Sequence, residues 1–97
     1  MEHPLAAWPL PYRGGELTVS FATFGALGDG IAPAEVAVFD VAGRRIRVLA
    51  SGNLPDGYHR ATWDGKSGQG IAVSSGIYFV RALSGGRESR LKVVVVR

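Results

Sequence analysis

The residues that could support catalysis are few and scattered along the chain. His59, Asp64 and Ser74 are the types that form a hydrolytic triad, in which a histidine removes the proton of a serine nucleophile. That chemistry requires a serine held on a strained turn, and no serine of this sequence lies in such a motif. We therefore expect no catalytic residues and no enzyme activity. His59 is expected to bond to backbone at one end of the fold.

A metal or cofactor site is not predicted either. The chain has two histidines and no cysteine, which are too few ligands of these types for zinc. The glycine-rich stretch after Asp64 could suggest a calcium loop, but Lys66 and Ser67 stand where further acidic ligands are needed, and only Gln69 could add an oxygen. Asp64 is instead expected to cap the turn by accepting the amide of Lys66 or Ser67.

The basic residues form two groups in a chain of net charge +3. One group is Arg44, Arg45 and Arg47. The second group lies near the C-terminal end and consists of Arg87, Arg90, Lys92 and Arg97. Basic residues that alternate with apolar ones are typical of the solvated face of a strand, whereas nucleic-acid binding favours a basic stripe with stacking aromatics. We expect no nucleic-acid binding, and we interpret the second group as residues that a protein partner recognises.

The elements that must position these residues begin with two strands joined by a glycine loop. Residues 58–64 alternate, with His59, Ala61 and Trp63 on one face. The pair Asp64-Gly65 then signals a turn, and a second alternating strand follows over residues 77–83. This second strand places Tyr78, Val80 and Ala82 on one face. Trp63 and Tyr78 are therefore the expected large core residues, with their polar tips at one end of the fold.

Four more strands are predicted around this pair. They cover residues 16–22, 34–41, 44–50 and 87–96, and the inward positions are expected to be Leu17, Val19, Phe21, Leu91, Val93 and Val95. Residues 23–33 are predicted to be a loop and residues 51–56 a turn. Short strands at regular spacing, separated by glycine turns, predict an all-β fold, namely an immunoglobulin-like antiparallel β-sandwich of about seven strands.

Three motifs resemble one family of bacterial domains. They are the stretch from Trp63-Asp64-Gly65 to Ser75-Gly76-Ile77-Tyr78, the hairpin V-x-V-F-D-x-x-G-R over residues 36–44, and the turn L-x-x-G-x-H over residues 54–59. The sequence resembles the immunoglobulin-like C-terminal domain that serves as the type IX secretion sorting domain (type A), and the related domain of the flagellar hook-capping protein. The core and motif residues are Phe39, Asp40, Gly43, Trp63, Asp64, Gly65, Gly76 and Tyr78.

The resemblance covers residues 16–97 and so divides the chain. Residues 1–15 are interpreted as a proline-rich linker and docking segment, and residues 16–97 as the sandwich. Trp8 and Tyr12 flank a proline pair where the family has a Pro-Asn-Pro-Phe motif. We expect both rings to pack over one end of the sandwich, and the alternative is an aromatic platform for a ligand. The stretch Gly25–Gly30 is longer than the family pattern, so a mobile or partner-specific loop is expected there.

The resemblance implies a non-catalytic C-terminal accessory module of a secreted or cell-surface bacterial protein, recognised by a type IX export machine. A sequence that ends at Arg97, directly after the last predicted strand, is expected to favour this interpretation. One alternative is an assembly scaffold like that of the hook-capping protein, which would self-associate through sheet edges. The other alternative is a carbohydrate-binding module that uses Trp8, Tyr12 or Tyr58.

The expected partners are proteins, either the export machinery or a domain of the parent protein. The expected location is extracellular or on the cell surface, and the alternative is periplasmic or flagellar. No apolar run approaches the roughly 20 residues that a membrane-spanning helix needs. The start of the sequence lacks the pattern of a signal peptide, so an export signal is expected upstream in a longer chain.

Overall fold

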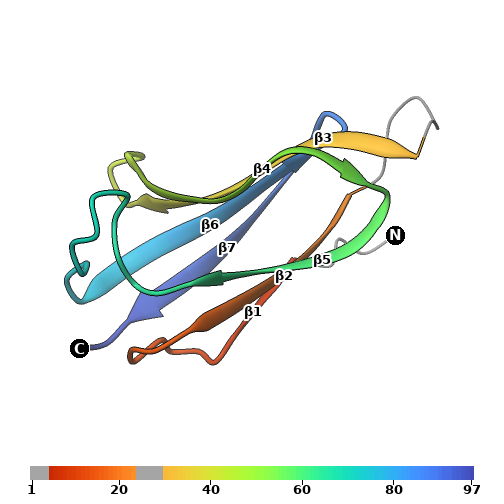
Figure 1. The fold of residues 1–97 in the computed structure, drawn as a ribbon. Helices are drawn as coiled ribbons and strands as arrows, with labels where there is room; N and C mark the ends of the chain where they lie inside the picture. The colour runs from red at the N-terminus through yellow and green to blue at the C-terminus, as the bar shows by residue number, and fades with distance from the viewer. Residues whose placement is uncertain (1–4, 24–29) are drawn as a thin grey trace.

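Seven strands form two antiparallel sheets in the computed structural model, which describes residues 5–23 and 30–97 (Figure 1). The strands are β1 Ala6–Trp8, β2 Leu17–Thr23, β3 Ile31–Asp40, β4 Arg45–Pro55, β5 Gly57–Trp63, β6 Gly76–Ser84 and β7 Arg87–Val95. One sheet has the order β1-β2-β5 and the other the order β4-β3-β6-β7. The predicted all-β immunoglobulin-like sandwich is confirmed. No helix long and apolar enough to cross a membrane occurs among the described residues.

The core lies between the two sheets and is built from alternate positions of their strands. Leu17, Val19 and Phe21 of β2 are buried, as predicted. The opposite sheet contributes the buried side chains of Val36, Val38, Tyr78, Val80, Ala82, Val93 and Val95. Leu91 is only half-buried, although it lies on the same face of β7 as Val93. Because burial of apolar surface contributes roughly 25 cal/mol per Å², this two-layer core is the main source of stability.

The N-terminal segment is part of the sandwich from β1 onward. Ala6 pairs with Ser20 and Trp8 with Thr18, which adds β1 to the edge of β2. The ring of Tyr12 is completely buried in the core, and its backbone binds β7 through Tyr12 N–H to Val94 O at 2.9 Å and Val96 N–H to Tyr12 O at 2.8 Å. Tyr12 thus packs as expected, whereas Trp8, for which the same packing was expected, is 43% exposed. The extended linker expected over residues 1–15 contains a paired strand and a core residue.

Strands β3 and β4 are longer than predicted. The loop predicted over residues 23–33 gives way to β3 at Ile31, and the turn predicted over residues 51–56 is strand as far as Pro55. The ladder between the two strands continues from Val36↔Ala50 to Ile31↔Pro55, so pairing prevails over local turn propensity. The expected mobile stretch, residues 25–30, lies outside the described residues except for Gly30.

The chain passes from one sheet to the other between β4 and β5. Asp56 is the only residue between the two strands, and its amide donates to the carbonyl of Gly30 at 2.9 Å. Gly57 follows with φ +130°, a conformation that glycine adopts readily. This crossing directs β5 back along the molecule, so that the loop after Trp63 and the C-terminal end lie at the same end of the sandwich (Figure 1).

Candidate functional site

The loop that follows β5 is held closed by the two residues that begin it. Trp63 is completely buried, and its indole Nε1–H donates to the carbonyl of Lys66 at 2.9 Å. Asp64 Oδ1 accepts the amide of Lys66 at 3.0 Å, whereas the amide of Ser67 donates to the carbonyl of Ile71 at 2.8 Å. The predicted cap by Asp64 is therefore confirmed, with Lys66 as its donor.

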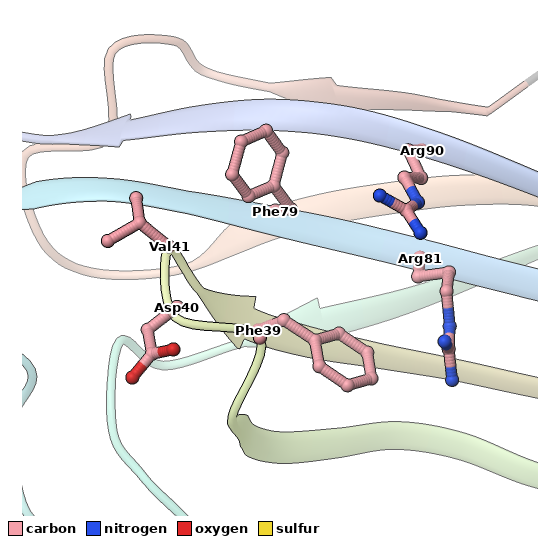
Figure 2. Close-up of a pocket in the computed structure, with 7 residues that line it drawn as sticks. Phe39, Asp40, Val41, Phe79, Arg81 and Arg90 are labelled. Atoms are coloured by element: carbon pink, nitrogen blue, oxygen red, sulfur yellow. The ribbon is translucent and has the colours of Figure 1, made fainter.

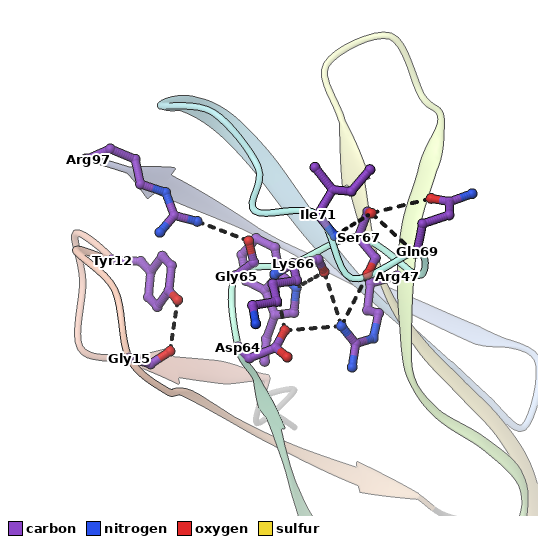
Figure 3. Close-up of polar contacts among 11 residues, drawn as sticks. Tyr12, Gly15, Arg47, Asp64, Gly65, Lys66, Ser67, Gln69, Ile71 and Arg97 are labelled. Carbon is purple, nitrogen blue, oxygen red and sulfur yellow. Dashed lines mark hydrogen bonds and ion pairs between the residues drawn. The ribbon is translucent and has the colours of Figure 1, made fainter.

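Arg47 of β4 braces the same turn from the other sheet (Figure 3). Its Nη1 lies 3.0 Å from Asp64 Oδ1, 3.2 Å from the carbonyl of Lys66 and 3.3 Å from that of Ser67. The alternation of basic and apolar residues predicts a solvated strand face for Arg47 and gives no sign of this role. An arginine between apolar neighbours looks the same in both situations, and only the position of the loop distinguishes them.

Arg97 closes the loop from the C-terminal side (Figure 3). Its Nη2 donates to the carbonyl of Gly65 at 2.9 Å, and its Nε donates to that of Val73 at 3.0 Å. The guanidinium carbon also lies 5.7 Å from the centroid of the Tyr12 ring. Arg97 therefore stabilises its own domain, and its recognition by a partner remains a prediction.

Gly65 is required at its position for two separate reasons. Its φ is +77°, in the left-handed region that costs other residues roughly 1–2 kcal/mol. A Cβ atom at this position would also clash with the hydroxyl of Tyr12 and would lie 2.9 Å from Nη2 of Arg97. The motif glycine thus lets Tyr12 and Arg97 approach the backbone closely.

Three aromatic rings form a cluster beneath the loop. The rings of Tyr12 and Trp63 are stacked at 5.5 Å between centroids, and those of Trp63 and Tyr78 are tilted at 6.1 Å. The hydroxyl of Tyr12 donates to the carbonyl of Gly15 and that of Tyr78 to the carbonyl of Ser74, each at 2.8 Å. The expected arrangement, with buried rings and bonded polar tips, is confirmed for Trp63 and Tyr78. Tyr12 is buried too, so it cannot serve as a ligand platform.

The motif hairpin between β3 and β4 is organised by one carboxylate. Asp40 Oδ1 accepts the amides of Ala42 and Arg44 at 3.0 and 2.9 Å, and Oδ2 accepts Nε of Arg44 at 3.0 Å. These bonds, above all the one from the Arg44 amide, hold the pKa of Asp40 below its ordinary value. Gly43 completes the turn with φ +84° and donates its amide to the carbonyl of Asp40 at 3.0 Å. Asp40 and Gly43 thus have structural roles.

The basic residues of the C-terminal group do not form one cluster. Arg90 and Lys92 are exposed on the outer face of β7, where the strand alternation predicted them. Arg87 begins β7 opposite Ser84, and Arg97 lies beyond its other end, so the two are about 30 Å apart along the strand. One contact with a partner could therefore include Arg90 and Lys92 together, or a residue at one end of β7, either Arg87 or Arg97, but not all four residues.

A shallow depression lies on this outer face, between the β3–β4 turn and the middle of β6 and β7 (Figure 2). We call it the outer hollow. Its volume is about 220 Å³, and it is lined by Phe39, Asp40, Val41, Gly43, Phe79, Arg81 and Arg90. The guanidinium of Arg81 lies 4.5 Å from the centroid of the Phe39 ring. The outer hollow combines two aromatic rings and two guanidinium groups with the carboxylate of Asp40, which already bonds to Ala42 and Arg44. The arginines and rings suit an anionic group with an apolar neighbour.

Residues 16–86 match the sequence profile of the FlgD Ig-like domain. The chain belongs to this family. No curated protein matches the sequence. The solved structures that share the fold include two at 19% sequence identity. One is PorZ, described as an essential bacterial surface component of the type IX secretion system of Porphyromonas gingivalis, with TM-score 0.65 over 97% of this chain. The other is dimeric latent PorU from the same organism, with TM-score 0.71 over 95% of this chain.

This FlgD Ig-like domain is small beside those two proteins. The chain spans 12% of the length of the PorZ chain and 9% of that of PorU. The predicted family resemblance is confirmed, and the likeness to PorZ and PorU concerns the fold alone.

The family motif residues are brought together in two places rather than one. Trp63, Asp64, Gly65 and Tyr78 belong to the loop end, and Gly76, with φ +155°, begins β6 beside them. Asp40 and Gly43 form the turn that borders the outer hollow, with Phe39 just before it. Phe79 and Arg81 are not among the residues predicted from the sequence. Their alternation along β6 could have placed them opposite the core face, but not next to Phe39 and Arg90.

His59, the residue most suggestive of catalysis, bonds to backbone. Its Nε2 lies 2.8 Å from the carbonyl oxygen of Pro55 and 3.1 Å from Thr23 Oγ1, which itself donates to the same carbonyl at 2.8 Å. The expected structural role of His59 is confirmed. No group of three or more potential metal ligands among His, Cys, Asp and Glu occurs in the part of the chain that the structure describes. That the domain lacks catalytic activity and metal binding stays a prediction.

Proposed function

We propose that this FlgD Ig-like domain is a non-catalytic accessory module of a secreted or cell-surface bacterial protein, where it acts in type IX secretion as a sorting or anchoring domain. The observation that carries the proposal is the fold match. Nearly the whole chain matches a small part of two much larger type IX secretion proteins, so the fold occurs as an added module within that system. The location that follows is extracellular or on the cell surface.

The geometry of the domain supports a recognition role over a catalytic one. Tyr12, Trp63 and Arg97 hydrogen-bond or stack within the domain at the loop end, so these three side chains already have partners inside the fold. The outer face of β6 and β7 instead presents Arg81, Arg90 and Lys92. A rigid module with a charged, accessible sheet face is suited to recognition by a protein.

The test is a secretion assay. A signal peptide, a reporter and residues 1–97 are fused in that order, and the fusion is expressed in a bacterium with type IX secretion and in an isogenic strain without it. We expect reporter in the medium or on the surface only when the machinery is present. A Val93→Asp variant, which places a charge in the core, is the unfolded control. Retention of the folded wild-type fusion inside both strains would rule out the sorting role.

A second candidate is an assembly scaffold, and the match to the FlgD Ig-like domain favours it. The first sheet is bordered by β1 and β5, and β5 pairs only with β2 among the strands described. An edge strand offers unpaired backbone groups to another copy of the chain. Sedimentation of the purified domain over a concentration series would reveal reversible self-association if this second role applies, and a monomer at all concentrations would count against it.

A further inference from the structure

The outer face of β6 and β7 places two arginines directly opposite each other. Arg81 pairs with Arg90 in the ladder (Figure 2). The next row on the same face contains Phe39, Phe79 and Lys92 in register. Like charges at directly opposed positions destabilise a sheet. An anion bound between the two guanidinium groups would remove that repulsion.

The carboxylates near the outer hollow, Glu88 and Asp40, already bond to groups of the domain. Glu88 Oε2 accepts Nε of Arg90 at 2.7 Å, and this bond leaves the two Nη groups of Arg90 for other partners. Asp40 is satisfied by Ala42 and Arg44, as described above. Within residues 5–23 and 30–97, the ion pairs do not include Arg81 or Lys92. Of the two arginines that line the outer hollow, Arg90 is therefore paired with Glu88, whereas Arg81 has no ion-pair partner among these residues.

The shape and lining of the outer hollow restrict what it can hold. Its volume of about 220 Å³ is below the roughly 300–1,000 Å³ of sites for drug-sized molecules, so it fits a side chain rather than a cofactor. The guanidinium carbon of Arg81 lies 4.5 Å from the centroid of the Phe39 ring. An arginine held beside an aromatic ring can still donate its N–H groups to a carboxylate. The rings of Phe39 and Phe79 offer apolar contact beside that charge.

We propose that the outer hollow binds a glutamate or aspartate side chain of an acidic, extended segment of a protein partner. The carboxylate would lie between Arg81 and Arg90, and an apolar side chain next to it in the partner would contact Phe39 and Phe79. That the partner is a protein rests on the proposed function. The binding proposal is tested on the purified domain, without export, so that failure of either proposal leaves the other standing.

The probe is a fluorescein-labelled peptide of eight residues that alternates glutamate with leucine, and its matched control alternates glutamine with leucine. Anisotropy measures binding, and amide chemical shifts of the ¹⁵N-labelled domain show where the peptide binds. We expect the acidic peptide to bind, to shift the amides of Gly43, Phe79 and Arg90, and to be released by salt. The double variant Arg81→Gln and Arg90→Gln should bind about ten-fold more weakly or worse, because it loses charge-assisted hydrogen bonds.

The control variant is the double substitution Arg13→Gln and Arg60→Gln, which removes the same charge from exposed positions outside the outer hollow. It should keep wild-type affinity, and circular dichroism should show both double variants folded. Equal binding of the glutamine peptide, equal loss in the control variant, or shifts away from the outer hollow would each overturn the proposal. The proposal would also be overturned if a sulfated polysaccharide shifted these amides and the acidic peptide did not.

Discussion

Trp63 connects three parts of the sequence that are far apart along the chain. Its ring contacts Tyr12 from the N-terminal segment and Tyr78 from β6, while its indole N–H fixes Lys66 in the loop. Each contact depends on the others, because the rings pack in one cluster and the loop closes over them. At the scale of single residues, Trp63 of the family motif therefore joins the two sheets at one end of the sandwich.

Replacing Trp63 by alanine should lower the free energy of unfolding by about 3–5 kcal/mol, because the ring is completely buried in the core. Urea denaturation of the variant and the wild type measures the loss. Trp63→Phe is the control, since it keeps an aromatic ring and removes the bond to Lys66, and it should cost less. A loss below about 1 kcal/mol in Trp63→Ala would contradict the burial of this ring.

Alanine substitutions at two glycines with similar backbone conformations distinguish the cost of the left-handed conformation from the cost of a steric clash. Gly65 and Gly43 have φ of +77° and +84°, but a Cβ would clash only at Gly65. Gly43→Ala should cost roughly 1–2 kcal/mol, the cost of the left-handed conformation. Gly65→Ala should cost a further 1–3 kcal/mol or so, because the hydroxyl of Tyr12 must move. Thermal and urea unfolding measure both, and equal losses would show that Tyr12 does not restrict Gly65.

Asp40 should make stability depend on pH in the acid range. Its pKa in the folded domain lies below its ordinary value, chiefly because of the Arg44 amide, so the folded state favours the charged carboxylate. This stabilisation is present above the unfolded pKa of about 3.9 and is lost as pH falls through the folded value. The difference in unfolding free energy between wild type and Asp40→Asn should therefore shrink below about pH 4. A difference that stays constant as pH falls would contradict this role.

At the scale of elements, the two ends of the chain stabilise each other. Tyr12 forms two backbone bonds with the end of β7, and Val93 and Val95 of β7 lie in the same core cluster as Tyr12. The guanidinium of Arg97 then lies near the Tyr12 ring while it bonds to Gly65. The N-terminal segment and β7 therefore form one interlocked unit.

Removing either end should unfold the domain. Deletion of residues 1–13 removes β1 and the buried ring of Tyr12, and a buried aromatic alone contributes about 3–5 kcal/mol of a total stability of about 5–15 kcal/mol. Deletion of residues 93–97 removes Val93, Val95 and the partners of Tyr12. Amide dispersion in ¹⁵N correlation spectra and circular dichroism report folding. A well-dispersed spectrum from residues 14–97 would instead support an independent sandwich that begins at residue 16.

At the scale of the whole molecule, the two sheets differ in what they offer to a partner. The outer face of the four-stranded sheet has the outer hollow with its arginines, whereas Trp8 and Tyr58 are exposed on the three-stranded sheet. The loop end is occupied by interactions within the chain. This distribution indicates that a protein partner would contact the outer face of the four-stranded sheet.

The domain should bind neither calcium nor zinc. Asp64 Oδ1 already accepts Arg47 and the amide of Lys66, so the single acidic group of the loop is neutralised. Isothermal titration calorimetry with each metal should give no stoichiometric heat. A heat that disappears in Asp64→Ala would show that the loop coordinates a metal after all.

The sequence by itself determined six of the seven strands (all but β1), most of their inward faces and the cap at Asp64. These features depend on local properties, because side chains alternate along a strand and an aspartate can bond an amide two residues away. The same local argument failed for residues 31–33 and 51–55. Turn-forming residues such as Gly52 and Pro55 became strand there, because a partner strand was available to pair with them.

Only the tertiary structure decided which of the arginines have specific roles. Arg47 and Arg97 bond to the loop, and Arg81 and Arg90 lie together at the outer hollow. Arg97 lies 32 residues from Gly65 in sequence, and Tyr12 reaches Val94 from the opposite end of the chain. Such contacts follow from the order and register of strands in the sheets. An arginine on an alternating strand carries no local signal of whether it faces solvent, a loop carbonyl or a second arginine.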